Sequence, residues 1–204
     1  MMEALYKDIS WTEGTWTNEP AAVEMKENHM TVQAVQESDY WEKTLYDFVH
    51  RNGHALLKEF TREEAMEVTF QLKDFTELYD QAGMMVMYDE LHWIKAGIEV
   101  IDGEPNISIV TTDGFSDCSN FPVPSWEGEE VTFRVSPFRD AVLIRVRTPG
   151  SRWITVRLSR FPFENGMKGG PMVCAPLRKD LKVKFTRWIT TQPDKAQHED
   201  PPIL

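Results

Sequence analysis

The sequence predicts an all-β protein, a two-sheet antiparallel sandwich of the jelly-roll type. Short stretches that alternate apolar and polar residues recur along the chain, and turn signals separate them. A period of two is typical of a strand with one buried face. No convincing long helical pattern interrupts these stretches. The strands must therefore bury their apolar faces by stacking two sheets.

The stretch 79–119 shows the alternation most clearly and predicts three strands joined by two tight turns. In its middle strand, one face carries Ile94, Ala96, Ile98 and Val100, and the other carries Trp93, Lys95, Gly97 and Glu99. Asp102-Gly103 predicts a hairpin turn, because glycine accepts the positive φ that such turns need. Trp93, Lys95 and Glu99 should therefore form a polar and aromatic row on one side of one strand.

Similar alternations predict further strands before and after this stretch, about ten to twelve in all. They lie at 28–34, 54–60, 131–135, 142–146, 154–158 and 181–185. Segment 161–171, which contains several glycines and prolines, is predicted to be a connection. We expect one domain over residues 1–191, followed by a disordered, polar and proline-rich tail over 192–204.

Segment 61–72 could be a helix or a strand. Thr61 and Glu64 match a helix capping box. Strict alternation of Met66, Val68 and Phe70 with polar or small residues favours a strand instead. Because a capping box is a short pattern that arises easily by chance, we predict a strand.

Composition excludes several classes of function. The formal net charge of −11 disfavours nucleic acid and anionic membrane surfaces as partners. No apolar run approaches the length of a transmembrane helix, and the N-terminus lacks the pattern of a secretory signal. The two cysteines, Cys118 and Cys174, are expected to be free thiols in a cytoplasmic protein.

Five segments resemble the family related to the regulation-of-enolase protein, within the concanavalin A-like lectin/glucanase superfamily. They are WEKTLYDFVHRNGH (41–54), LYDQAGMMV (78–86), WIKAGIEV (93–100), FSDCS (115–119) and GGPMVCAP (169–176). A domain similar to this family is found at the C-terminus of some β-xylosidases. The resemblance implies a jelly roll with one concave face. It also implies a role in regulating a glycolytic enzyme, or in binding near a carbohydrate site.

The chain departs from the family pattern at three positions. Leu45 stands where family members often have histidine, Asp47 where glycine is usual, and Cys118 where tryptophan is frequent. The changes at Leu45 and Cys118 remove a polar or stacking group near the expected concave face.

A sugar or small-metabolite site is the leading candidate. Carbohydrate sites combine an aromatic face, which stacks on C–H groups, with polar side chains that fix the hydroxyls. The candidate ligand-binding residues are Trp41, Lys43, His54, Gln81, Trp93, Lys95, Glu99 and Asp117. In the alternative interpretation, the tryptophans fill the core and the polar row is ordinary solvated surface. An exposed Trp93 would favour the binding site.

Catalysis and metal binding have weaker support. The catalytic members of the superfamily carry Glu-x-Asp-x-x-Glu on one strand, whereas this chain has Glu99, Asp102 and Glu104 at another spacing. Glu99 could instead form a salt bridge with Lys95. His50 and His54 have a spacing that suits a helix, not a strand, as a metal site. Asp102, Glu104 and Asn106 could hold calcium, but such a turn is more often solvated surface.

We therefore expect a non-catalytic binding or regulatory protein linked to carbohydrate metabolism, without cofactor or metal. Its ligand would be a sugar or small metabolite on the concave sheet. One alternative is a protein-interaction regulator of a glycolytic enzyme such as enolase. A second alternative is a glycoside hydrolase with a non-standard acid pair.

Overall fold

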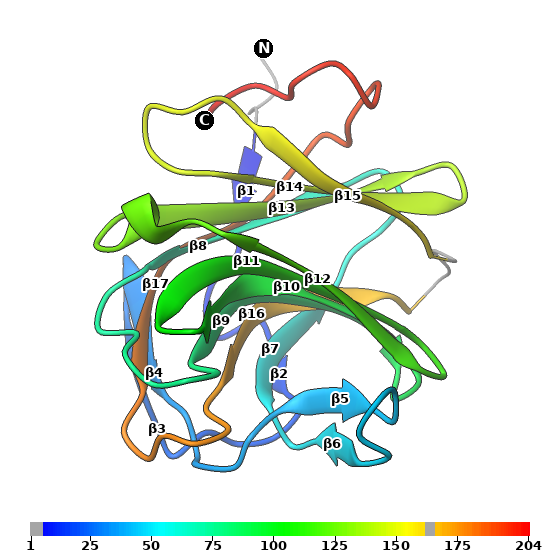
Figure 1. The fold of residues 1–204 in the computed structure, drawn as a ribbon. Helices are drawn as coiled ribbons and strands as arrows, with labels where there is room; N and C mark the ends of the chain where they lie inside the picture. The colour runs from blue at the N-terminus through cyan, green and yellow to red at the C-terminus, as the bar shows by residue number, and fades with distance from the viewer. Residues whose placement is uncertain (1–5, 162–165) are drawn as a thin grey trace.

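The structure, a computed structural model, describes residues 6–161 and 166–204. Two antiparallel sheets stack on each other (Figure 1). The seven-stranded sheet, here called the concave sheet, consists of β2 (Thr15–Trp16), β7 (His54–Glu59), β9 (Gln81–Asp89), β10 (His92–Ile101), β11 (Glu104–Asp113), β12 (Ser116–Pro122) and β16 (Lys168–Cys174). Its strand order is β12-β11-β10-β9-β16-β7-β2.

The eight-stranded sheet, here called the back sheet, covers the convex side of the first. It consists of β1 (Tyr6–Asp8), β3 (Ala22–Lys26), β4 (His29–Gln33), β8 (Ala65–Gln71), β13 (Glu130–Phe138), β14 (Ala141–Arg147), β15 (Ile154–Arg160) and β17 (Lys182–Thr191). Its order is β15-β14-β13-β8-β17-β4-β3, and β1 pairs with β17. A 3₁₀ turn, η1 (Pro124–Trp126), links β12 to β13. The predicted two-sheet sandwich is confirmed.

The core between the sheets is built from the apolar faces that the alternation predicts. Ile94, Ala96 and Ile98 of β10 lie in it, together with Phe70 of β8 and Phe133 of β13. The opposite face of β10 carries Trp93, Lys95, Gly97 and Glu99, which pair across the sheet with Met87, Met85, Gly83 and Gln81 of β9. These residues lie on the outer, concave side.

The central meander is longer than predicted, with four strands instead of three. The Asp102-Gly103 hairpin forms as expected, since both residues have positive φ, 54° and 80°. Segment 61–72 is the strand β8, preceded by a turn. The backbone N–H of Thr61 donates to Oε2 of Glu64 at 3.0 Å, so the capping-box contact forms without a helix.

The prediction of a connection over 161–171 is wrong in its second half, because β16 begins at Lys168 and pairs with both β9 and β7. Residues 162–165 lie outside the described part of the chain. A Cβ atom on Gly170 would lie 2.0 Å from the carbonyl oxygen of Leu56, so only glycine allows this close approach. Gly170, one of the glycines that suggest a loop, is therefore required by the packing of strands.

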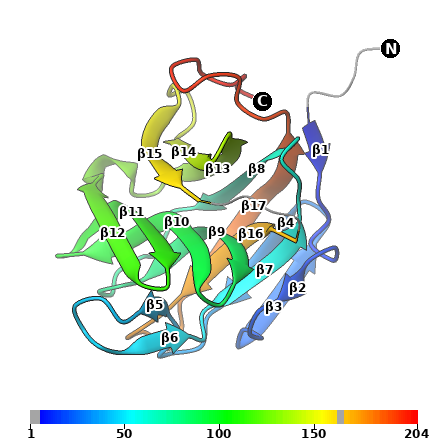
Figure 2. The same cartoon turned by 90° about the vertical axis from the view of Figure 1, so that its right-hand side faces the viewer.

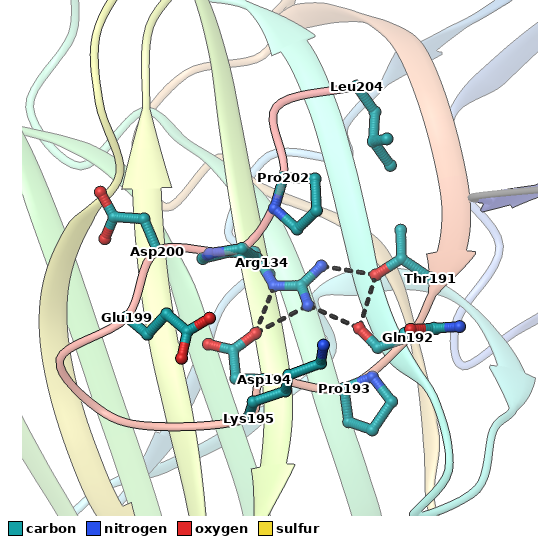
Figure 3. A pocket seen from close by; sticks show the side chains of 11 residues that line it. Arg134, Thr191, Gln192, Pro193, Asp194, Lys195, Glu199, Asp200, Pro202 and Leu204 are labelled. Carbon is teal, nitrogen blue, oxygen red and sulfur yellow. Dashed lines mark hydrogen bonds and ion pairs between the residues drawn. The ribbon is translucent and has the colours of Figure 1, made fainter.

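Segment 192–204 is not the disordered tail that its composition predicts. It crosses the outer face of the back sheet and is anchored there by the fully buried side chain of Asp194 (Figure 3). Arg134 Nε contacts Asp194 Oδ1 at 2.8 Å, and Arg145 Nε contacts Oδ2 at 2.7 Å. The partners of Asp194 are 60 and 49 residues away in the sequence, and both arginines also donate to backbone carbonyls of this segment.

Within the described residues, no helix is long and apolar enough to cross a membrane.

Candidate functional site

A short hairpin lies against the concave sheet and forms one wall of a cavity. Its strands are β5 (Tyr40–Glu42) and β6 (Val49–Arg51) (Figure 2). Tyr40 packs on Trp93 with ring centroids 5.8 Å apart, and the backbone N–H of Glu42 donates to Ser116 Oγ at 2.9 Å. These contacts hold the hairpin over β10 and β12.

The cavity beside this hairpin, here called the concave cavity, has a volume of about 380 Å³. Its floor comes from the outer faces of β10, β11 and β12, and its rim from the hairpin and the segment before β9. The lining residues are Asp39, Trp41, Tyr46, Phe48, Tyr79, Lys95, Glu99, Ile101, Val110, Cys118 and Asn120.

Lys95 lies at the base of the cavity, with its side chain 6% exposed. Its Nζ donates to Asp39 Oδ1 at 2.9 Å, to the carbonyl oxygen of Tyr40 at 3.1 Å and to Gln81 Oε1 at 2.7 Å. An ammonium group has three N–H donors, so all are used. Burial alone would lower the pKa of Lys95, but the carboxylate of Asp39 raises it, and Lys95 is a cation.

Glu99 belongs to the same network through Gln81. The amide Nε2 of Gln81 donates to Glu99 Oε1 at 3.0 Å, and Ser108 Oγ donates to Oε2 at 2.7 Å. The same amide nitrogen lies 3.5 Å from Asp39 Oδ1, so the two carboxyl groups are close neighbours. Burial raises the pKa of Glu99, and the charge of Asp39 adds to the rise, while Lys95 opposes it.

The predicted Lys95–Glu99 salt bridge is replaced by the pair of Lys95 with Asp39. Asp39 lines the cavity with its side chain 20% exposed. Its Oδ1 accepts from Lys95 and from the backbone N–H of Tyr40, whereas Oδ2 has no hydrogen bond within residues 6–161 and 166–204. One acceptor atom therefore stays accessible at the base of the cavity.

Aromatic side chains form the rim. Trp41 and Tyr46 pack edge to face at 6.0 Å, and Tyr46 stacks on Phe48 at 5.1 Å. Tyr46 is 54% and Phe48 42% exposed, so two stacked rings face solvent at the cavity, and contiguous exposed apolar surface marks interaction sites. Tyr79, in the segment before β9, also lines the cavity.

The rim is held in an uncommon backbone conformation. Lys43, Leu45 and Asp47 in the β5–β6 loop have φ of 59°, 70° and 55°, and Tyr79 has 67°. Non-glycine residues adopt this region rarely, and such strain concentrates at ligand clamps and active sites. The left-handed Asp47 also explains why glycine would suit that position.

Of the residues predicted from the sequence, four come together at this site. Trp41, Lys95 and Glu99 line the concave cavity, and Gln81 links the last two.

The other four predicted residues lie elsewhere. Trp93 is 1% exposed beneath Tyr40, so it fills the core as in the alternative interpretation and does not line the concave cavity. His54 is buried between two segments, where Nδ1 donates to the carbonyl oxygen of Asn18 and Nε2 accepts from the backbone N–H of Val35. Burial lowers its pKa.

Lys43 and Asp117 are outside the cavity. The ammonium group of Lys43 lies over the ring of Phe115, 5.2 Å from its centroid. Asp117 is exposed and forms an ion pair with Arg157.

Asp39, Tyr46 and Tyr79 line the cavity but are not among the residues that the sequence predicts for the site. All three lie outside the alternating strands, in segments whose path depends on left-handed residues or on the hairpin. A cluster of aromatic residues over 40–48 was the one available signal.

The described residues contain no group of three or more histidine, cysteine or acidic side chains that could hold a metal ion. Both cysteines are free thiols: Cys118 is exposed at the cavity, and Cys174 is buried. Burial raises the pKa of both thiols. A second cavity, of about 260 Å³, lies between the tail and the back sheet (Figure 3).

The fold and sequence resemble known proteins. The chain is 37% identical over 194 residues to "Regulation of enolase protein 1" of Saccharomyces cerevisiae, covering 95% of this chain and 97% of that protein. A crystal structure of a functionally unknown protein from Saccharomyces cerevisiae has a TM-score of 0.84 at 34% identity, covering 91% of this chain and 99% of that one.

A more distant likeness shows the fold alone. A xylan β-1,4-xylosidase from Bacillus halodurans has a TM-score of 0.64 at 15% identity. The match covers 94% of this chain and 40% of the xylosidase. A family model described as "Protein of unknown function (DUF1349)" matches residues 16–193. The chain therefore belongs to the DUF1349 family and has its concanavalin A-like sandwich fold.

Proposed function

We propose that the protein is a non-catalytic binding protein whose concave cavity takes a sugar or a related small metabolite. One observation carries the proposal: polar side chains fixed by their own hydrogen bonds lie at the base of a cavity with an aromatic rim. Sugars are recognised by this combination, because rings contact their C–H groups and fixed polar atoms meet their hydroxyls.

Preorganisation supports this proposal. Asp39, Gln81 and Glu99 are held by Lys95 and Ser108 before any ligand arrives. A ligand therefore does not lose binding energy in ordering these side chains. The exposed ring of Tyr46 stands at the entrance, where it can stack on a sugar ring.

A thermal-shift and calorimetric screen against mono- and oligosaccharides tests the proposal. A ligand at one hundred times its dissociation constant should stabilise the fold by about 2.7 kcal/mol. The variant Tyr46→Ala should abolish binding, whereas Tyr88→Ala should not, because Tyr88 is similarly exposed but lies outside the concave cavity. Equal loss in both variants, or no hit at all, would contradict the proposal.

A second candidate is a regulator that binds a glycolytic enzyme, as the name of the yeast relative suggests. The supporting observation is the exposure of apolar side chains near the cavity mouth, with Leu45 82% and Phe115 62% exposed. Purified enolase and this protein, mixed at micromolar concentration, should then co-elute in gel filtration. Leu45→Asp should remove the complex, and failure of the parent protein to bind would end this candidate.

A glycoside hydrolase is the third candidate, since Asp39 and Glu99 are neighbouring carboxyl groups in one cavity. Hydrolysis needs one acid to protonate the leaving oxygen and a second to attack or activate water. If chromogenic glycosides are cleaved at all, Glu99→Gln should lose that activity. An unchanged rate would exclude this pair.

A further inference from the structure

The charges around the concave cavity restrict which ligands it can accept. Lys95 is the one cation among the described residues that line it. Its three N–H donors are bound to Asp39, Tyr40 and Gln81, so none can turn to a ligand without breaking a buried hydrogen bond.

The negative groups are only partly used. Asp39 Oδ2 has no hydrogen bond within the described chain, and the oxygens of Glu99 each accept one hydrogen bond and have room for another. The polar surface at the base of the cavity therefore offers acceptors more than donors. The available donors are neutral groups: the Tyr46 and Tyr79 hydroxyls and the Asn120 amide.

Neither protonation state of Glu99 makes the cluster of Lys95, Asp39 and Glu99 positively charged. With Glu99 ionised, Lys95 faces two carboxylates and the cluster carries an excess negative charge. With Glu99 protonated, the pair of Lys95 and Asp39 is neutral. Neither state leaves a positive charge uncompensated, so a phosphate or carboxylate entering the cavity would lose its hydration without gaining a cation.

We propose that the concave cavity selects uncharged, hydroxyl-bearing saccharides and rejects their phosphorylated and acidic forms, with Asp39 as the residue that determines this specificity. The inference rests on the proposed sugar-binding function and sharpens it. Hydroxyl groups both donate and accept, which matches Asp39 Oδ2 and Glu99 on one side and the tyrosine hydroxyls and Asn120 on the other.

Amino sugars are a poorer match. A ligand ammonium group would meet the carboxylates, but it would also approach the buried ammonium of Lys95, which is already paired with Asp39. An ammonium group also cannot accept from the tyrosine hydroxyls or from the Asn120 amide.

The test uses the full chain and matched ligands. Each neutral saccharide that binds in the calorimetric screen is compared with its 6-phosphate, its uronic acid and its amino form, at low and at physiological salt. We expect the two anionic forms to bind at least tenfold more weakly than the neutral form, and the amino form to bind no more tightly than the neutral form. The difference for the anions should shrink as salt rises.

Asp39→Asn isolates the specificity residue. The ratio of the dissociation constants of the phosphorylated and the neutral ligand should fall at least threefold in this variant, because one negative charge beside Lys95 is removed. Asp74→Asn is the matched control: it changes the net charge equally at a residue that does not line the cavity, and its φ of 62° suits asparagine. The control should leave the ratio unchanged.

The outcomes separate the two proposals. A phosphorylated or acidic sugar that binds as tightly as its neutral form would overturn the charge selection and leave the sugar-binding function intact. Preference for the amino form would overturn it as well. An equal change of ratio in Asp39→Asn and Asp74→Asn would refute the role of Asp39. If no saccharide binds, the proposed function fails and the inference with it. If Asp39→Asn does not fold, the comparison of neutral and charged ligands in the parent protein still decides whether the cavity selects by charge.

Discussion

Both outer faces of the sandwich carry buried cations held by carboxylates, but they differ in what they leave unused. On the back sheet, Arg134 and Arg145 share the carboxylate of Asp194, and the tail covers them. On the concave sheet, Lys95 is also fully paired, but its partner Asp39 keeps one oxygen free beside a cavity.

The difference separates a structural network from a binding one. In the back-sheet network, both carboxylate oxygens of Asp194 and most guanidinium donors are used within the chain. Such an arrangement locks a segment in place but has little left for a ligand. In the concave network, the same type of ion pair serves to fix the position of groups that remain accessible.

The largest loss of stability is expected when the back-sheet network is disrupted. Asp194→Ala leaves two buried arginines without their shared carboxylate, which should cost about 3–5 kcal/mol in the free energy of unfolding measured with urea. Asp200→Ala is the control. Its carboxylate is 3.2 Å from Arg145 but 48% exposed, so the cost should stay below about 1 kcal/mol. If both variants lose a similar free energy of unfolding, the burial of Asp194 does not make it a stronger anchor than Asp200.

A smaller loss of stability is expected when the concave network loses its cation, Lys95. Lys95→Met should cost about 1–3 kcal/mol, less than Asp194→Ala, because water from the cavity can solvate the partly exposed Asp39. Lys43→Met, which removes an exposed lysine, should change the free energy of unfolding by less than about 0.5 kcal/mol. If Lys95→Met is the most damaging of these variants, the concave network is the main structural anchor and the comparison must be reversed.

The smallest effect depends on pH. Because the pKa of Glu99 is raised in the folded protein, the folded state holds this proton more tightly than the unfolded state does. The ionisation of Glu99 therefore lowers stability as the pH rises above its ordinary value of 4.5 towards its folded pKa. Glu99→Gln removes this loss, so its melting temperature relative to the parent should rise with pH.

Melting temperatures recorded from acidic to neutral pH check this expectation. Glu104→Gln, the same chemical change at the exposed end of the Asp102-Gly103 turn, is the control. A relative melting temperature of Glu99→Gln that is flat or falls with pH would contradict the burial assigned to Glu99.

The sequence predicted the floor of the candidate site better than its rim. Gln81, Lys95 and Glu99 could be assigned to one face because a strand alternates strictly and each strand was recognisable. Trp93 shares that face, and alternation alone could not reveal that Tyr40 would cover it. Whether a sheet face is buried depends on what packs over it. Here a hairpin covers it, and the loop of that hairpin contains residues in the left-handed conformation.

The back-sheet network was missed for a related reason. Arg134 and Arg145 occupy outward positions on strands that the alternation identifies, where charged residues are normally solvated. Their burial depends on Asp194, in a segment whose composition is typical of disorder. Neither side of the contact carries a local signal, so only the three-dimensional structure brings them together.

The most direct measurement is an NMR titration of the isotope-labelled protein with a neutral saccharide, following side-chain N–H signals. We expect the Trp41 indole and the Gln81 and Asn120 amides to shift together, whereas the Arg134 and Arg145 Nε–H signals and the Trp153 indole stay fixed. That pattern would place the ligand in the concave cavity. Shifts confined to the arginines of the back sheet, or no shifts at millimolar saccharide, would contradict the assignment of the binding site.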